Sequence, residues 1–309
     1  MPSSTLESIT AEPGTRARGT GTFAIHWPRL RLFLEGWQRF RRHRAALVGL
    51  GLLAMLLALS LAAPLLTPYD PVRQDLSQVL RPVSVAHPLG TDHLGRDMLA
   101  RILYGGRLSL LIGFLAVGVG LAVGVPLGAV SGFQGGRTDL VIQRFADILL
   151  SFPGFLLALS LVAILGVGLR NVIISVGISA VPSFIRLVRG SVLSIREQVY
   201  VEAAQALGQR QSVIIVRHVL PNAMAPVIVQ ATLSLGFAIL VAAGLGFLGL
   251  GVQPPTPEWG TMLGEGRQYI FRAPSLTTFP GLAIFLAVLG FNLFGDGLRD
   301  ALDPRMRTF

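Results

Sequence analysis

The chain has 309 residues, of which 52% are hydrophobic and 14% charged, and its mean hydropathy is +0.64. Soluble domains carry about 25% charged residues, so the composition excludes an ordinary soluble domain. The net charge of +10 rests on arginine, because all 26 basic residues are arginine and none is lysine. The chain therefore cannot hold a P-loop, whose lysine reaches the β- and γ-phosphates. With no cysteine, it can form neither a disulfide nor a thiolate metal site.

The N-terminal segment is polar. Residues 2–22 are rich in Ser, Thr, Pro, Gly and Arg and lack apolar periodicity, so residues 1–38 are predicted to be a disordered cytoplasmic tail. Residues 39–44, directly before the first apolar run, are rich in arginine. Because basic residues beside a span fix its orientation, this cluster is interpreted as a topology anchor rather than a site for nucleic acid.

Six apolar segments follow, each about as long as a membrane span. A hydrocarbon core about 30 Å thick needs about 20 apolar residues per helix. The segments are residues 45–66, 108–132, 147–169, 171–190, 223–250 and 277–298. Only helices or closed barrels satisfy the backbone in lipid, and these runs are too long for barrel strands. The sequence therefore predicts an all-α polytopic membrane protein with six transmembrane helices, the first of them an N-terminal anchor.

The arginines divide unevenly between the two sides of such a protein. With the N-terminus in the cytoplasm, 18 arginines fall inside and eight outside, which is the positive-inside distribution. Both the N- and C-termini are therefore predicted to be cytoplasmic. No ionisable side chain lies in the middle of any predicted span, and proton- or voltage-driven proteins usually need one there. That absence argues against an ion-coupled carrier.

The outer loop after the first span, residues 67–107, is rich in proline and in mixed charges. Four of its charged residues have near-helical spacing, which predicts local ion pairs that each contribute little. These residues are Asp92, Arg96, Asp97 and Arg101. His87 and His93 lie close by, but no third ligand is suitably spaced, so no metal site is predicted. Two interpretations stay open, a packed cap on the outer face and a contact for an external protein.

The third predicted span begins near an acidic residue and contains a proline. Asp147 is placed to cap the positive end of that helix. Pro153 is predicted to kink it near its inner end.

The segment between the fourth and fifth spans, residues 200–222, reads YVEAAQALGQRQSVIIVRHVLPN. It predicts a short helix, a glycine break, a second short helix along the membrane surface, and a proline that opens the next span. Its defining residues are Glu202, Ala203, Ala204, Gly208, Leu220 and Pro221. The glutamate lies where a helix favours negative charge, the alanines allow close approach, and Gly208 can end the helix with a positive φ. A short helix laid into a partner's groove is a common recognition mode, so this segment is predicted to be a docking loop.

Glycines end the fifth span and prolines follow it, between residues 244 and 257. Small residues let helices pack closely in lipid, which explains each glycine singly. Non-helical backbone at membrane depth is tolerated only where it lines a cavity or is buried. As a unit, the segment is therefore hypothesised to form an outer gate near Trp259 and Glu265.

The docking-loop spacing resembles the EAA loop of permease subunits in bacterial ABC importers, with His218 where that pattern has isoleucine. Three further stretches, residues 87–109, 247–266 and 290–307, are similar to the C-type permease of dipeptide and oligopeptide importers, a family with nickel and glutathione relatives. The resemblance runs from Arg39 to Arg307.

This resemblance implies a permease subunit of an ATP-driven importer for dipeptides or oligopeptides, in the bacterial cytoplasmic (inner) membrane. It implies an anchor helix and external loop at 39–107, a permease core at 108–300 and a cytoplasmic tail at 301–309. The expected partners are a paralogous second permease, two ATP-binding subunits, an external substrate-binding protein and membrane lipid. No catalytic residue, cofactor or metal is expected on this chain, since ATP and Mg²⁺ would be bound by the ATP-binding subunits.

Three alternatives are kept. The same architecture could import nickel or another small solute. A secondary carrier would need a coupling-ion site, which the charge-free spans argue against. A membrane scaffold or receptor subunit would need no transport path, and its deletion would leave transport intact.

Overall fold

The computed structural model describes residue 41 and residues 43–302, and all of its long elements are helices. The α-helices are α2 (Arg44–Leu61), α3 (Ala63–Leu66), α4 (Met98–Gln134), α5 (Gly136–Leu150), α6 (Gly154–Leu165), α7 (Leu169–Arg196), α8 (Val199–Ala206), α9 (Gln211–Ile214), α10 (Leu220–Phe247), α11 (Trp259–Gly266) and α12 (Ser275–Leu302). Short 3₁₀ turns cover Leu76–Gln78 and Arg267–Tyr269, and a π turn covers Ile215–Val219.

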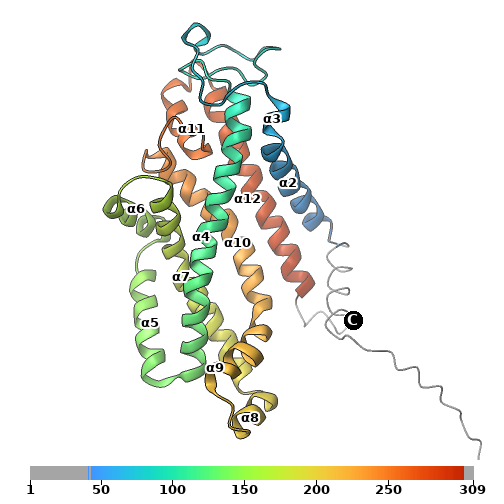
Figure 1. The fold of residues 1–309 in the computed structure, drawn as a ribbon, viewed down its shortest axis with the longest axis vertical. Coiled ribbons are helices and arrows are strands. Elements are labelled where there is room, and N and C mark those ends of the chain that lie inside the picture. The colour runs from blue at the N-terminus through green and yellow to red at the C-terminus, as the bar shows by residue number, and fades with distance from the viewer. Residues whose placement is uncertain (1–40, 42, 303–309) are drawn as a thin grey trace, which may run out of the picture.

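The long helices run side by side along the long axis of the molecule (Figure 1). Among the described residues, five helices are long and apolar enough to cross a membrane, or six spans result if the bent pair α5–α6 counts as one. Residues 67–97, which we call the outer segment after the predicted orientation, lie at one end of the bundle, together with α11. Helices α8 and α9 lie at the opposite end (Figure 1). The predicted all-helical polytopic fold is confirmed.

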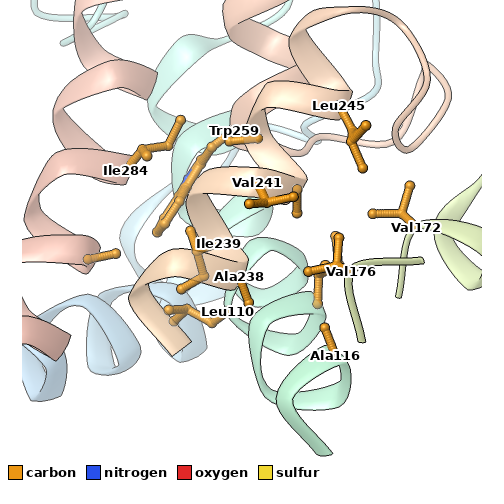
Figure 2. Packing of buried hydrophobic residues seen from close by; sticks show 14 of the residues in the cluster. Leu110, Ala116, Val172, Val176, Ala238, Ile239, Val241, Leu245, Trp259 and Ile284 are labelled. Atoms are coloured by element: carbon orange, nitrogen blue, oxygen red, sulfur yellow. The ribbon is translucent and has the colours of Figure 1, made fainter. Parts of the chain in front are cut away.

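The core lies where α4, α7, α10, α11 and α12 meet, and α10 packs against the other four. Figure 2 shows part of it, including Leu110 of α4, Val176 of α7, Ile239 of α10, Trp259 of α11 and Ile284 of α12. Because apolar side chains fill this region from five elements, the helices hold one another in place without any sheet among the described residues.

The most extensive helix pair is α4 with α7. A row of glycines four residues apart lets the two backbones approach, at Gly120, Gly124, Gly128 and Gly132. A Cβ atom at Gly124 would lie 2.6 Å from the Phe184 Cβ, and one at Gly128 would lie 2.6 Å from the Ile185 carbonyl oxygen. Small residues in such rows are typical of close helix packing in membranes.

The second span begins earlier than predicted. Helix α4 starts at Met98, whereas the sequence placed residues 98–107 in the outer loop. Asp97 is its N-cap, because its carboxylate accepts the Ala100 N–H at 2.7 Å. A carboxylate in this position satisfies an otherwise unpaired N–H of the first turn, so the helix extends beyond the apolar run.

The prediction of one kinked helix over 147–169 is wrong. The chain forms two helices, α5 and α6, bent by 89° at a break of three residues. Pro153 has no N–H and disfavours helical geometry in the preceding residue, so the helix stops instead of bending. Asp147 lies in the last turn of α5 and accepts Arg186 Nη2 of α7 at 2.6 Å. Its predicted role as a helix N-cap is therefore also wrong.

Some predictions lie outside the described residues. These are the tail at 1–38, Arg39 and Arg42 of the basic cluster, and residues 303–309 of the C-terminal tail.

Candidate functional site

The predicted docking segment lies at the end of the molecule remote from the outer segment (Figure 1). Its first limb is α8, which ends at Ala206 with Leu207 as its C-cap, and Gly208 follows with φ of 71°. Two backbone bonds close the helix, Leu207 N–H to Ala203 O at 3.0 Å and Gln209 N–H to Ala204 O at 3.2 Å. The predicted positive φ of Gly208 is confirmed. Glycine takes this conformation at no steric cost.

Helix α8 has one buried and one free side. Val201 and Ala204 are buried in a small apolar cluster with Ile214 and Val219 of the second limb. Glu202 and Ala203 are exposed. The large apolar side chains at its two ends are also exposed, Val199 at 79% and Leu207 at 81%. Exposed apolar side chains next to a charged residue at the tip of a molecule are typical of a partner contact.

The second limb differs from the prediction of a separate helix along the membrane surface. Helix α9 passes through the π turn directly into α10, so that Gln211–Phe247 is one helical span of 37 residues. In the π turn, the Leu220 N–H bonds the Ile215 carbonyl, five residues back. Pro221, in the first turn of α10, has no N–H to donate. The wider turn therefore accommodates the proline without interrupting the helix.

Polar side chains join the two limbs, and sequence reasoning missed two of them. His218 Nε2 lies 3.1 Å from Gln209 Oε1. Asn222 Nδ2 donates to the Tyr200 hydroxyl at 3.2 Å and to the His218 carbonyl at 2.6 Å. The spacing of Tyr200 and Asn222, at the two ends of the segment, is the sequence signal that could have pointed to this contact. The residue that departs from the family pattern, His218, thus has a structural role.

A cavity of about 560 Å³ opens beside α8. It is lined by Phe133, Arg196, Glu197, Glu202, Gln205, Gln209, Gln211 and Ile214. Arg196 donates to the Gly132 and Phe133 carbonyls at 3.3 and 3.4 Å, which joins the end of α7 to the end of α4. The docking segment therefore rests on the inner ends of the most extensive helix pair.

At the outer end, Glu265 belongs to a buried ion-pair cluster. Its Oε2 accepts Arg96 Nη2 at 3.1 Å and Arg101 Nη2 at 3.0 Å. Asp92 Oδ2 lies 2.5 Å from Arg96 Nε and 3.5 Å from Arg101 Nε. Both arginines are 1% exposed. The predicted local pair forms between Asp92 and Arg96. The arginines are also buried and bridge the outer segment and α4 to α11, which the prediction of weak local pairs did not include.

Trp259 is fixed by hydrogen bonds to α4. Its ring Nε1–H donates to the Ile102 carbonyl at 3.0 Å, and its backbone N–H donates to Ser109 Oγ at 3.1 Å. Glu258 caps α11 by accepting the Gly260 and Thr261 N–H groups, and it also accepts the Ser109 hydroxyl at 2.8 Å. Helix α11 is therefore tied to α4 at both ends. Sequence reasoning missed Glu258 and Ser109, because glutamate is not among the residues preferred at a helix N-cap.

Three groups near this cluster could ligate a metal, since ligand atoms of Asp92, His93 and Glu265 lie within 4.8 Å of one another. Both carboxylates are already bound by guanidinium groups, and a cation there would be repelled by both arginines. His93 stacks on Tyr269 with ring centroids 5.4 Å apart. His87 lies elsewhere, with Nδ1 2.9 Å from Asp97 Oδ2. The charges therefore favour an ion-pair network over a metal centre.

A polar cavity of about 710 Å³ opens on the outer segment, and Tyr69, Asp70, Asp75 and His87 are among its lining residues. The Ser77 hydroxyl donates to Asp75 Oδ1 at 2.6 Å and the Ser77 N–H at 3.0 Å. These bonds favour the ionised carboxylate and lower the pKa of Asp75. The outer face thus presents a hollow that carries negative charge.

Two family models match the chain. Residues 124–308 match the model described as "Binding-protein-dependent transport system inner membrane component". Residues 32–82 match the "N-terminal TM domain of oligopeptide transport permease C". The first match includes the docking segment, α11 and α12.

Curated relatives match most of the chain. The dipeptide transport system permease protein DppC of Alkalihalophilus pseudofirmus is 49% identical over 274 residues, which are 89% of this chain and 90% of that protein. The di/tripeptide transport system permease protein DppC of Pseudomonas aeruginosa is 48% identical over 280 residues, 89% of this chain and 92% of that protein. The glutathione transport system permease protein GsiD of Pectobacterium atrosepticum is 46% identical over 276 residues, 89% of this chain and 91% of that protein.

Among solved structures, the chain resembles one from the MetNI methionine ABC transporter in an inward-facing conformation. The TM-score is 0.55 and the identity 21%, and the match covers 67% of this chain and 98% of that chain. At this identity the likeness shows a shared fold.

Proposed function

Because the chain belongs to the binding-protein-dependent inner membrane transport components, as a permease of the oligopeptide C type, we propose that it forms half of a translocation path for dipeptides and other short peptides. It is a multi-pass membrane subunit of an ABC transporter complex, and the ATPase of such a complex belongs to other subunits. The predictions of a permease and of a chain that is not an enzyme are thus confirmed.

The proposal of a peptide substrate rests on the substrates for which the relatives are named. Dipeptide, di/tripeptide and glutathione permeases all match about nine-tenths of the chain at 46–49% identity, and glutathione is itself a tripeptide derivative. None of the relatives reported above is named for nickel. The Asp92–His93–Glu265 group does not supply it, because its carboxylates are neutralised by Arg96 and Arg101.

The docking assignment rests on the free side of α8. Glu202 and Ala203 are exposed, whereas Ala204 is buried in the apolar cluster that holds the helix in place. Gly208 ends the helix and reverses the direction of the chain. Leu220 and Pro221 then join the second limb to α10. Such a helix presents a small, firmly held surface to a groove. We propose that this groove belongs to an ATP-binding subunit.

The proposed complex has a paralogous second permease, two ATP-binding subunits and an external substrate-binding protein. Closure of the ATP-binding pair would move the docking helices. The inner ends of α4, α7 and α10 would move with them, because α8 and α9 pack on these ends. The outer cavity beside Tyr69 and Asp75 is a surface suited to contact with the external protein.

The test is purification of the tagged chain from its host in mild detergent, followed by reconstitution with the proteins that co-purify. A second permease and P-loop ATPases should be recovered, and the reconstituted complex should take up dipeptides only with ATP and the binding protein. Uptake by the chain alone, driven by a proton or sodium gradient, would overturn the proposal. ATP-driven uptake of nickel without peptide uptake would overturn its substrate.

A further inference from the structure

A cavity of about 790 Å³ opens between α7, α10 and α12, at the end of the bundle that carries the docking segment. Its walls are mostly apolar, with side chains such as Val229 and Leu233, but it also holds Gln230, Asn222 and Arg299. A mostly apolar cavity with a few placed polar groups is the usual form of a small-molecule site.

The depth of the polar groups argues against a surface that faces lipid. Gln230 lies ten residues after the start of α10, which is about 15 Å along the helix. Its side-chain amide bonds Ser234 Oγ at 3.3 Å, one turn deeper still, and both residues are only half-buried. Polar side chains within a span face protein or water. This side of α10 is therefore expected to contact either another protein surface or water.

Helix α12 shows the same feature across the cavity. Arg299 lines the cavity. Asn292 and Asp296 are also exposed and, at spacings of four and three residues, lie on the same side of the helix as Arg299, beside the cavity. Within the described residues, Arg299 has neither an ion-pair partner nor a hydrogen-bond acceptor. An acidic and a basic side chain on one open face can pair with the two charged ends of a zwitterion. A lipid tail has no charged group that could pair with either side chain.

We propose that this cavity is the inner vestibule of the transport path and that it takes a short zwitterionic peptide, whose carboxylate faces Arg299. The proposal rests on the peptide-permease function proposed above and specifies where on this chain the substrate passes. Gln230 and the free Oδ1 of Asn222 can bond the peptide amides, because the Asn222 amide nitrogen is already used by Tyr200 and His218. Asp296, one turn deeper than Arg299, faces the ammonium group.

The chain contains no cysteine, so single cysteines report water access without background from this subunit. We would place a cysteine at Leu233 in the vestibule and, as a matched control, at Leu57, which is 48% exposed on the apolar helix α2. Membrane-impermeant anionic and cationic thiosulfonates are applied to inside-out vesicles that contain the whole complex. Only single-cysteine variants that still take up dipeptide with ATP in cells are used. The Arg299 variants that are added to them need only assemble into the whole complex, because Arg299 is proposed to bind the peptide.

The expected result is that Leu233→Cys reacts at least about tenfold faster than Leu57→Cys, because hydrophilic reagents do not enter the hydrocarbon. The anionic-to-cationic rate ratio should fall about fourfold when Arg299→Gln is added, as for a unit charge roughly 10 Å away in water. Arg299→Lys should keep the ratio.

An active complex in which Leu233→Cys is unreactive would overturn the proposal and indicate that the second permease or lipid covers this face. Reactivity with an unchanged ratio in Arg299→Gln would overturn the role of Arg299. A wild-type complex without ATP-driven peptide uptake would instead contradict the function proposed above, so the two failures are distinguishable.

Discussion

At the residue scale, Gly208 carries the turn of the docking segment. No atom lies within 4 Å of the place where its Cβ would stand, so a side chain there meets only the strain of φ at 71°. Replacing it by Val should cost about 1–3 kcal/mol locally and reorient α8. We expect Gly208→Val to weaken co-purification of the ATP-binding subunits and to reduce peptide uptake, while membrane insertion is unchanged.

The matched variant is Gly208→Asn, because asparagine tolerates the left-handed region better than other residues with a side chain. It should keep most of the association and uptake. If Gly208→Val assembles and transports normally, the docking assignment is wrong.

Glu265 allows a second test at this scale. Its carboxylate is the common acceptor of two buried arginines. Removing one member of a buried pair typically costs about 3–5 kcal/mol, so Glu265→Gln should lower the thermal unfolding temperature of the detergent-solubilised chain clearly. The control is Asp147→Asn. Its pair with Arg186 is 45–55% exposed, and such pairs contribute about 0–1 kcal/mol. Equal effects of the two variants would contradict the burial of the cluster.

These two sites differ in what the sequence could predict. The φ of Gly208 follows from a local pattern, a short helix that ends at a glycine. The cluster joins Arg96 to Glu265, which are 169 residues apart. Nothing in the spacing of Asp92, Arg96 and Arg101 indicates a partner on another element, so the sequence predicts only local pairs such as Asp92–Arg96.

At the element scale, the glycine row fixes how closely α4 and α7 pack. Gly128→Leu would drive a side chain into the Ile185 carbonyl and the Val188 Cβ, 2.6 and 2.8 Å from a Cβ there. Overpacking typically costs about 1–3 kcal/mol, occasionally more, and here the nearest obstacle is backbone. We expect loss of the folded, monodisperse chain in size-exclusion chromatography.

Gly118→Leu is the matched control on the same helix, because its Cβ would meet nothing within 4 Å. Leucine also favours a helix over glycine by somewhat less than about 1 kcal/mol, so this variant should fold at least as well as the wild type. Similar losses in both variants would show that the row does not control packing.

Hydrophobic runs predicted the existence of the spans better than their ends. The run at 147–169 is apolar enough for a span, but hydropathy does not show whether such a run is straight. The 89° bend between α5 and α6 is visible only in the structure. Helix α5 begins at Gly136, before the apolar run, because Arg189 of α7 holds Asp139 with two bonds of 2.6 and 2.7 Å. Tertiary ion pairs of this kind extend helices through polar sequence, which hydropathy assigns to loops.

At the scale of the whole molecule, the two ends are built differently. Buried polar bonds tie the outer segment, α4 and α11 together, whereas α8 at the docking end is held by apolar packing and by hydrogen bonds between exposed side chains. We expect hydrogen–deuterium exchange of residues 92–109 and 258–266 to stay slow both without nucleotide and with the complex trapped by ATP and vanadate. Exchange of residues 199–209 should slow when the ATP-binding subunits assemble.

This experiment also tests the outer gate hypothesised near Trp259 and Glu265. If residues 258–266 exchange faster in the trapped complex, α11 leaves α4 during the cycle and the gate is supported. If residues 258–266 stay protected, α11 remains packed on α4 through the cycle, and any gate there moves only together with α4.

The unbroken helix from Gln211 to Phe247 has a mechanical consequence. Its 37 residues correspond to a rod about 55 Å long, at 1.5 Å per residue. A tilt of about 5° around one end displaces the other by about 5 Å, which is close to one helical turn. The limb that meets the ATP-binding subunit would thus be one end of a single rod whose other end lies beside α11. Force applied at the cytoplasmic face could then reach the opposite side of the bilayer through a single element, without a relay of side chains.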